Sequence, residues 1–338
     1  MPAFRTGTVT AILSERAGLQ RVEVDGEPSY VLTQLIGNVA VGDRVVVNTT
    51  AVDLSLGTGG WHVVHWNLSH QNGITVPGGG HVMKLRYTSL QADLGVAEEH
   101  HEWADTIDGT PVVALALHSQ LGPAAAAMKS VDATRRIIYV MTDAGALPLA
   151  LSDLAADLVA AGLVDATVTA GHAFGGDAEA VNVRSALAVA CHHLRADLVI
   201  VGMGPGSVGT GTGTGFSGLS VGATLDAVNA AHGHAIAALR VSDADSRPRH
   251  QGVSDHSRTV LRTAVHTPVT VPVPHGTTDL PDLGPHATVI EVDVPDALAL
   301  LAANHIAPTT MGRDALTDPR LFSFAAAAGA YAARLLRQ

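Results

Sequence analysis

The chain has 338 residues, about twice a typical domain length of ~150 residues, so we expect two domains or one large domain with an appendage. Apolar residues make up 47% of the sequence and charged residues 15%, with a mean hydropathy of +0.25, which excludes an intrinsically disordered chain. No apolar run approaches the roughly 18 residues of a membrane-spanning helix. The formal net charge of −11 argues against nonspecific binding to nucleic acid or to anionic membranes.

The N-terminal residues and the cysteine content indicate the cellular compartment. Residues 1–10 lack the basic segment followed by an apolar stretch that marks a secretory signal, so the cytoplasm is the expected location. Cys191 is the only cysteine, which excludes an internal disulfide framework and any zinc site built from several thiolates.

Residues 1–68 have the pattern of a small all-β domain. Short runs of alternating or β-branched residues are separated by turn sequences such as Asp25-Gly26. The expected strands are residues 6–12, 20–24, 30–35, 43–48 and 61–67. Strands this short and this closely spaced predict a small barrel of the SH3 or OB type. The segment lacks a basic face interleaved with aromatic residues, so we interpret it as a structural or interaction module rather than a nucleic-acid binder.

Residues 69–81 are polar and glycine-rich and are predicted to be a linker into an α/β domain spanning residues 82–338. The expected strands are residues 111–117, 136–141, 165–169, 197–201 and 235–240. The expected helices between them are residues 123–131, 152–161, 178–194 and 219–231. A further strand and helix are expected at residues 289–292 and 296–304. Nearly continuous apolar strands alternating with amphipathic helices predict a mostly parallel, Rossmann-like sheet with helices on both faces.

Two features of the helices carry additional expectations. Ser152 and Asp177 stand directly before predicted helices and have side chains suited to the N-cap position. The alanine-rich helix that closes the chain, residues 322–336, is interpreted as part of the core or as the seam of a homo-oligomer.

Polar residues are concentrated in the loops that follow the predicted strands. These loops are residues 118–120, 142–145, 171–177, 202–218 and 242–245, and each carries His, Asp, Ser or several Gly. The carboxyl ends of parallel strands share one edge of the sheet, where ligands of such folds bind in a crevice. Turns between strands and helices often need Gly or Asp whatever the function, which explains single residues of this kind. This explanation fits less well when all five loops carry such residues. We therefore predict a functional crevice at this edge.

The glycine-rich segment 202–218 is the strongest single signal. Eight of its 17 residues are Gly, and it joins a strand to a helix, so that backbone N–H groups and the helix N-terminus can converge on an anion. The candidate ligand-binding residues here are Gly204, Gly206, Gly209, Thr210, Gly211, Thr212 and Gly213. The alternative is a lid or an ordered structural loop that binds nothing.

Two nucleotide-binding motifs bear on this segment. Residues 204–209, GPGSVG, match the G-x-G-x-x-G string of dinucleotide-binding folds directly after a strand. In that motif the helix begins inside the string, whereas nine more residues intervene here, so NAD(P) is disfavoured as a cofactor. A Walker loop is excluded, because the segment has no Gly-Lys-Ser/Thr and the only lysines, Lys84 and Lys129, lie elsewhere.

A cluster of cations follows the fifth strand of the predicted sheet. Five arginines fall within 23 residues: Arg240, Arg247, Arg249, Arg258 and Arg262. The guanidinium group recognises phosphate or carboxylate through two parallel hydrogen bonds, so Arg247 and Arg249 are candidates for binding a small anion.

The same segment contains side chains that can bind a divalent metal. The candidates are Asp243, Asp245, His250 and His256. Their spacing matches no known metal signature, so a metal remains an alternative to a solvated loop with internal ion pairs.

Candidate residues for proton transfer are present in several segments that follow predicted strands. His172 with Asp177 could supply a base and the carboxylate that orients it, although Asp177 is equally explained as a helix N-cap. His250 is a second candidate for proton transfer, and Asp143 is a further candidate carboxylate. His118-Ser119 could supply a base and a nucleophile, but no G-x-S-x-G elbow surrounds the serine.

Several strings together resemble one known family. They are residues 84–91 (KLRYTSLQ), 117–121 (LHSQL), 142–148 (TDAGALP), 171–183 (GHAFGGDAEAVNV), 203–212 (MGPGSVGTGT) and 247–257 (RPRHQGVSDHS). In this combination the chain resembles the bacterial domain-of-unknown-function family 3866 over nearly its whole length. The resemblance implies no established activity, but it implies that these loops form a shared site.

Three functional hypotheses follow. The first is an enzyme, a hydrolase or transferase, that acts on a small phosphorylated or carboxylated metabolite. The second is a noncatalytic ligand-binding or assembly protein with the barrel as its docking module. The third is an NAD(P)-dependent oxidoreductase. A small anionic ligand is the expected partner in the first, and neither nucleic acid nor membrane is expected.

Overall fold

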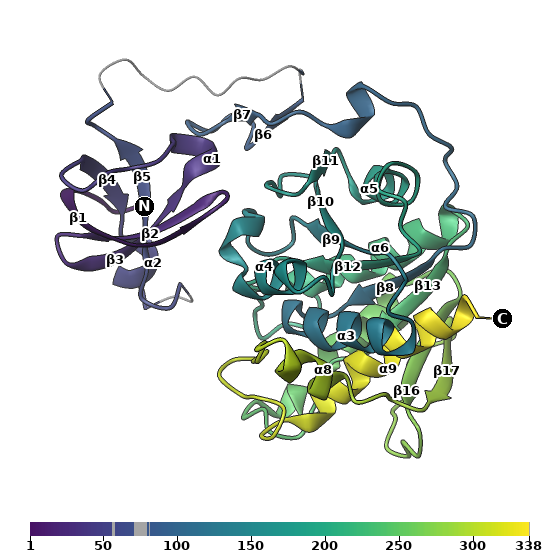
Figure 1. Ribbon diagram of the computed structural model, residues 1–338. Helices are drawn as coiled ribbons and strands as arrows, with labels where there is room; N and C mark the ends of the chain where they lie inside the picture. The colour runs from purple at the N-terminus through teal and green to yellow at the C-terminus, as the bar shows by residue number, and fades with distance from the viewer. Residues whose placement is uncertain (56–57, 71–79, 81, 338) are drawn as a thin grey trace. The chain divides into compact units, whose positions relative to one another are not determined.

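A computed structural model describes residues 1–55, 58–70, 80 and 82–337 (Figure 1). Contacts within the chain divide it into two compact units, Met1–Gly95 and Val96–Gln338. Residues 82–95 therefore group with the first unit. Of the linker predicted at residues 69–81, residues 71–79 and 81 lie outside the described residues. Among the described residues, no helix combines the length and the apolar sequence needed to cross a bilayer.

The first unit contains a closed five-stranded barrel, which confirms the predicted barrel. Its strands are β1 (Phe4–Arg16), β2 (Leu19–Val24), β3 (Glu27–Leu32), β4 (Arg44–Asn48) and β5 (His62–Asn67). They lie in the order β1-β2-β3-β5-β4, and pairing of β1 with β4 closes the barrel. Alternation along the strands directs one set of side chains inward, so that Val22, Val24, Val31, Val45 and Val47 are all buried.

Short elements complete the regular structure described in this unit. They are the helices α1 (Thr33–Ile36) and α2 (Thr50–Asp53) and the hairpin of β6 (Met83–Lys84) and β7 (Ala92–Asp93). A single 3₁₀ turn, Ala97–Glu99, follows at the start of the second unit.

The second unit is built on an eight-stranded, all-parallel sheet in the order β11-β10-β9-β12-β8-β13-β16-β17. The strands are β8 (Pro111–Leu115), β9 (Ile137–Thr142), β10 (Ala166–Ala170), β11 (Ala178–Ala180), β12 (Leu198–Met203), β13 (His234–Ala238), β16 (Val269–Pro274) and β17 (Ala287–Val292). The central strands are apolar throughout because both of their faces are covered, and every residue of β8, β9 and β12 is buried. The predicted α/β fold is confirmed.

Helices cover both faces of the sheet (Figure 1). They are α3 (Leu121–Val131), α4 (Asp153–Ala160), α5 (Val183–Ala188), α6 (Ser220–Ala230), α7 (Asp255–Thr259), α8 (Ala297–Ala303) and α9 (Pro319–Leu335). Helix α3 packs with α4, α8 and α9 against one face, whereas α5, α6 and the turn after α7 contribute to the core on the other face. Short π-helical turns, Val189–His193 and Val260–Ala264, extend α5 and α7.

The alanine-rich closing helix, α9, belongs to the core. Its residues from Phe324 to Ala330 are buried, and it packs closely on α3. A Cβ atom added at Gly329 would lie 2.1 Å from the carbonyl oxygen of Ala124, so only glycine permits this approach of the two helices.

The helix predicted at residues 178–194 is wrong in its first part. Residues Ala178–Ala180 form the edge strand β11, and α5 begins only after Asn182, whose side chain accepts from the amide N–H of Ser185. Asp177 is therefore not an N-cap. Its Oδ2 instead accepts hydrogen bonds from the amide and hydroxyl of Thr167, at 2.8 and 2.9 Å, and thereby fixes the loop beside β10.

The strand order creates a switch point in the middle of the sheet. The chain leaves β8 through α3 on one face and leaves β12, its neighbour, through α6 on the other face. Because the two connections diverge, the carboxyl ends of β8 and β12 open a crevice between their loops, which is where ligands of such sheets bind.

Candidate functional site

Two adjoining cavities lie at the carboxyl ends of β8, β12 and β13. The smaller cavity has a volume of about 90 Å³ and the wider cavity about 520 Å³. Leu117, Ser207, Arg240 and Arg247 line both of them. The two cavities are therefore neighbouring parts of one crevice, at the edge of the sheet where the sequence predicts it.

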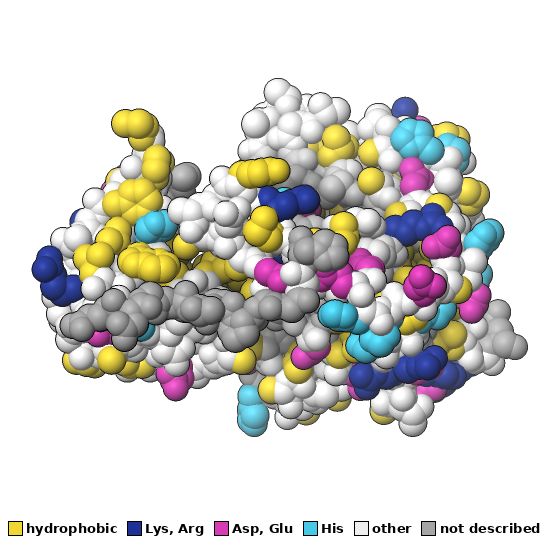
Figure 2. Space-filling view, turned by 90° about the horizontal axis from the view of Figure 1, so that it is seen from above, with side chains coloured by type: hydrophobic (Ala, Val, Ile, Leu, Met, Phe, Trp, Pro, Cys, Tyr) yellow, Lys and Arg dark blue, Asp and Glu magenta, His cyan; other side chains and the backbone are white. Residues whose placement is uncertain are grey.

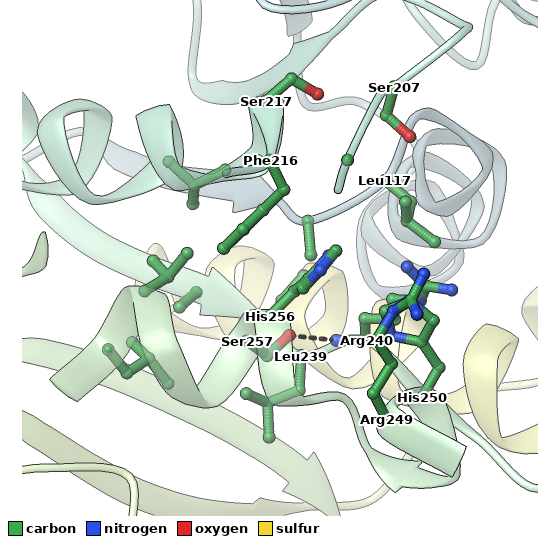
Figure 3. A pocket seen from close by; sticks show the side chains of 18 of the residues that line it. Leu117, Ser207, Phe216, Ser217, Leu239, Arg240, Arg249, His250, His256 and Ser257 are labelled. Atoms are coloured by element: carbon green, nitrogen blue, oxygen red, sulfur yellow. Dashed lines mark hydrogen bonds between the residues drawn. The ribbon is translucent and has the colours of Figure 1, made fainter. Parts of the chain in front are cut away.

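The smaller cavity combines an apolar floor with an aromatic wall. Its floor consists of aliphatic side chains from β13, α6 and the turn after α7. The rings of Phe216 and His256 stack with centroids 3.8 Å apart and 6° between their planes, and His250 meets His256 edge-on at 4.6 Å. Arg240 and Arg249 lie to one side of these rings (Figure 3). The cavity thus offers an apolar surface directly beside guanidinium groups.

A buried carboxylate organises the arginines of the crevice. Asp245 is 2% exposed, and its Oδ2 lies 2.9 Å from Nη2 of Arg240, 2.9 Å from Nη2 of Arg247 and 3.3 Å from Nη2 of Arg313. Hydrogen bonds from Arg247, aided by the nearby guanidinium of Arg240, hold the pKa of Asp245 well below its usual range. We refer to Arg240, Arg247, Arg249 and Arg313 as the arginine cluster.

The arginine cluster carries more positive charge than its carboxylates neutralise. Its second carboxylate is that of the fully buried Asp318, which lies 3.0 Å from Nε of Arg313. Four guanidinium groups against two carboxylates leave an excess of two positive charges. On the molecular face shown in Figure 2, basic and acidic side chains are instead interspersed.

Arg240 is held in place by the local backbone. The strands β14 (Val241–Ser242) and β15 (Gly252–Val253) form a small hairpin just beyond it. The amide N–H of Arg240 donates to Oγ of Ser257 at 3.0 Å (Figure 3). Arg240 is 6% exposed, and burial lowers its pKa to about 10. Its Nε has no hydrogen-bond partner among the described residues.

The two histidines of the crevice are held neutral. Nε2 of His250 accepts from Nε of Arg249 at 3.2 Å, so Nδ1 carries the proton and donates to Oγ of Ser254 at 2.7 Å. Burial, reinforced by the arginines, lowers the pKa of His250 to about 3 and that of His256 to about 4. A negatively charged group entering the crevice would raise the pKa of both histidines.

Three of the five arginines in the sequence cluster reach the crevice. Arg240, Arg247 and Arg249 line it, whereas Arg258 pairs with Asp255 and Arg262 pairs with Asp282, outside either cavity. Arg313 and Asp318, which the sequence reasoning missed, complete the cluster from a distant part of the chain. Asp318 precedes a proline at the start of α9, a pattern typical of helix starts, but its carboxylate makes no capping bond.

The predicted ligand residues of the glycine-rich segment separate into two groups. Gly204, Gly206 and Gly209 line the cavities, and a Cβ at Gly209 would lie 3.5 Å from Cε1 of His256. The tip of the loop contains the other four predicted ligand residues, none of which lines either cavity: Thr210, Gly211, Thr212 and Gly213. Hydrogen bonds within the loop engage the hydroxyls of Thr210 and Thr212.

The first helical turn begins only at Ser217, near the end of this segment and well beyond Gly209. The helix N-terminus is therefore not placed inside the G-x-G-x-x-G string, as the dinucleotide fingerprint requires.

The proton-transfer candidates of the other loops lie apart from the arginine cluster. The amide N–H of His172 donates to Oδ2 of Asp143 at 3.2 Å, which joins the loops after β9 and β10. His172, Asp143 and Asp177 line neither cavity. Of the sequence candidates for proton transfer, His250 lines the smaller cavity and His118 lines the wider one.

The candidate metal ligands do not form a common site. Asp245 is bonded to arginines, Asp243 pairs with Arg320 at 3.1 Å, and both ring nitrogens of His250 are engaged. Within the described residues, no group of three or more His, Cys, Asp or Glu side chains is arranged to hold a metal ion.

The wider cavity contains a pairing that the sequence does not reveal. His118 and Ser152 both line it, with Nε2 of His118 2.6 Å from Oγ of Ser152. The predicted N-cap role of Ser152 is confirmed, because its Oγ also accepts from the amide N–H of Ala155 at 2.9 Å. His118 is thus paired with a serine 34 residues away rather than with the adjacent Ser119.

Comparison with known proteins gives one match. Residues 29–329 match the family described as "Protein of unknown function (DUF3866)". No curated protein and no solved structure matches the chain. Because the matched region covers nearly all of the chain, from the barrel to helix α9, the protein belongs to the DUF3866 family.

Proposed function

We propose that the protein binds a small ligand bearing a phosphate or carboxylate group, with the anionic group against the arginine cluster where the two cavities meet. The observation that carries this proposal is Arg240, a buried residue that lines both cavities and shares its carboxylate partner, Asp245, with Arg247 and Arg313. One carboxylate cannot neutralise three guanidinium groups, so an anion in the crevice would supply the missing negative charge.

The charge of the site supports the same ligand class. The arginine cluster exceeds its two carboxylates in charge, and Arg249 makes no ion pair with either of them. Guanidinium groups bind phosphate and carboxylate oxygens through charge-assisted hydrogen bonds, which are stronger than neutral ones. An anionic group therefore complements the part of the crevice formed by the arginine cluster, whereas Asp153 and Asp157 also line the wider cavity.

The shape of the site restricts the rest of the ligand. The smaller cavity takes only a small apolar or flat group, against the stacked rings of Phe216 and His256. The wider cavity is more polar and takes a larger polar part of the ligand. We therefore favour an amphipathic anionic metabolite, and an enzyme of the hydrolase or transferase class acting on it.

The proposal is tested by the melting temperature of the full chain with inorganic phosphate, pyrophosphate and a panel of phosphorylated and carboxylated metabolites. Potassium chloride at matched ionic strength is the reference. A ligand present at 100 times its Kd should stabilise the fold by about 2.7 kcal/mol. Arg249→Ala should remove the shift, because Arg249 is in the crevice and its side chain is not needed to balance Asp245.

Arg262→Ala is the matched control, since Arg262 belongs to the same run of arginines but pairs with Asp282 outside the crevice. It should retain the full shift. Equal shifts in the two variants, or no shift beyond that of chloride across the panel, would overturn the proposal. Binding without turnover of any ligand would identify a noncatalytic binding protein.

A further inference from the structure

We propose that Ser152 is a nucleophile and His118 its general base, and that this pair transfers or hydrolyses an acyl group of the ligand in the wider cavity. The inference deepens the proposed function, because it names the reacting groups and the bond broken. It rests on the proposed function only for the position of the ligand's anionic group.

The distance between the two side chains suits proton transfer. Oγ of Ser152 lies 2.6 Å from Nε2 of His118, within the range expected for a nucleophile and its base. Both residues line the wider cavity, which they share with Arg240 and Arg247. A carbonyl group in this cavity can therefore approach the serine while an anionic part of the same ligand contacts the arginines.

The hydrogen bonds around His118 fix the tautomer that a base needs. The hydroxyl of Tyr139 lies 3.2 Å from Nδ1 of His118 and 3.3 and 3.4 Å from the carbonyl oxygens of Gly202 and Met203. Carbonyl oxygens only accept, so the phenol donates to them and its oxygen accepts the proton on Nδ1. Nε2 is then left with its lone pair facing the hydroxyl of Ser152. Tyr139 and the carbonyls orient the imidazole, the part played by a carboxylate in a serine triad.

The environment keeps the base in its reactive form. Burial lowers the pKa of His118 to about 4, while a hydrogen bond to the Met203 carbonyl acts in the opposite direction. The imidazole is therefore neutral at pH 7 and able to accept a proton. An anionic ligand in the same cavity raises this pKa towards neutrality, where general-base catalysis is most efficient.

The position of Ser152 favours charge development on its oxygen. It caps α4, and the amide N–H of Ala155 donates to its Oγ at 2.9 Å. This bond and the positive end of the helix dipole both stabilise negative charge. Asp153 and Asp157 of α4 line the same cavity, so the anionic part of the ligand is directed away from α4 and towards Arg240.

The chemical step balances as ester hydrolysis. As Oγ of Ser152 bonds to the acyl carbon, its proton passes to Nε2 of His118. The bond from the carbonyl carbon to the leaving oxygen then breaks, and the leaving alkoxide takes that proton. Water attacks the acyl-serine and gives a proton to Nε2, the acyl–Oγ bond breaks, and the serine recovers its proton. The net reaction is ester plus water giving acid plus alcohol, with no redox partner.

The test uses diisopropyl fluorophosphate, a small probe that phosphorylates activated serines with release of fluoride. The full chain is incubated with the probe, and the labelled residue is identified by peptide mass spectrometry. We expect label on Ser152. His118→Asn, which leaves the serine in place, should slow labelling by about 100-fold or more. Ser130→Ala is the control, because Ser130 is an exposed serine of α3 that lines neither cavity. It should label at the wild-type rate.

A second variant guards against simple loss of folding. Ser152→Gly removes the hydroxyl but keeps a residue accepted at N-caps. It should lose the label and keep the wild-type far-UV circular dichroism spectrum. Absence of label on Ser152 in the wild-type chain, or equal labelling of His118→Asn, overturns the inference.

The two proposals fail separately. A phosphate-induced rise in melting temperature without label leaves the anion site standing and removes the serine mechanism. Label on Ser152 without a phosphate-induced rise in melting temperature keeps the serine mechanism and removes the anion site.

Discussion

Arg240 and Asp245 form a buried ion pair in which only one side of the guanidinium is used. Nη2 of Arg240 lies 2.9 Å from Oδ2 of Asp245, while Nε has no partner among the described residues. Asp245 must also serve Arg247 and Arg313, so one carboxylate is shared by three cations. Asp245 therefore holds three guanidinium groups together without neutralising them all. An anion bound in the crevice would supply the missing negative charge.

The first prediction concerns this shared carboxylate. Asp245→Asn should lower the free energy of unfolding by about 3–5 kcal/mol, because it leaves buried guanidinium groups without their counter-charge. Phosphate should restore part of the loss by taking the place of the missing charge. Urea unfolding with and without phosphate measures both effects.

Asp282→Asn is the control for that substitution, since Asp282 is exposed and pairs with Arg262 at the surface. It should leave the urea midpoint unchanged, with or without phosphate. A midpoint for Asp245→Asn equal to that of wild type would contradict the account of the arginine cluster.

The second prediction concerns His256. Burial and the neighbouring Arg240, Arg249 and Arg247 lower its pKa to about 4, against the opposing effect of Asp255. A bound anion should offset the arginines and raise this pKa, so that binding takes up protons near pH 5. The chemical shifts of the imidazole ring, followed by NMR during a pH titration with and without phosphate, measure the change. Superimposable titration curves would show that no anion binds beside this ring.

The third prediction concerns the contact between two loops. Gly204 lies so close to the loop after β9 that a Cβ would be 2.3 Å from the carbonyl oxygen of Ala146. Gly204→Ala should push the glycine-rich segment away from that loop, lowering both the melting temperature and the affinity for phosphate. Gly211→Ala is the matched control, because no atom lies within 4 Å of the position of its Cβ. Equal effects of the two substitutions would contradict the close approach.

The fourth prediction concerns stability in acid. The pKa values of His118 and His256 are lowered to about 4 and that of His250 to about 3, whereas an unfolded histidine titrates near pH ~6.5. Between these limits the unfolded chain binds more protons than the folded chain, so the free energy of unfolding should fall as the pH drops from about 6.5 to about 4. The part of the range above pH ~5 is the one to compare, because carboxylates with ordinary pKa values of ~3.9 and ~4.3 take up few protons there.

His256→Phe should make that fall smaller, because a phenyl ring can stack on Phe216 but cannot take up a proton. Urea unfolding at several pH values between 7 and 4.5 compares the two proteins. Parallel pH profiles would show that His256 is not buried as a neutral ring.

Much of the fold is predictable because its elements depend on local pattern. The strands β8, β9 and β12 are apolar throughout since they are covered on both faces, and the barrel strands alternate since only one face is buried. The error at Asp177 has a physical cause. An aspartate before an apolar run is compatible with a helix cap, but here it bonds to the neighbouring strand β10 through Thr167.

The site is less predictable because its pairings join distant parts of the chain. Arg240, Arg247 and Arg249 are visible as a local cluster, but Arg313 meets Asp245 across 68 residues and no local pattern marks it. The pairing of His118 with Ser152 likewise joins residues 34 positions apart, in the loop after β8 and at the N-cap of α4. The threonines of the glycine-rich segment resemble ligand groups, yet Thr210 and Thr212 bond to each other within their own loop.

The most direct measurement is a crystal structure of the full chain soaked with tungstate, an analogue of phosphate that anomalous diffraction locates unambiguously. The account predicts an anomalous peak in the crevice, with tungstate oxygens within hydrogen-bonding distance of the guanidinium groups of Arg240 and Arg249. Tungstate bound only elsewhere on the protein, with the crevice empty at saturating concentration, would contradict it.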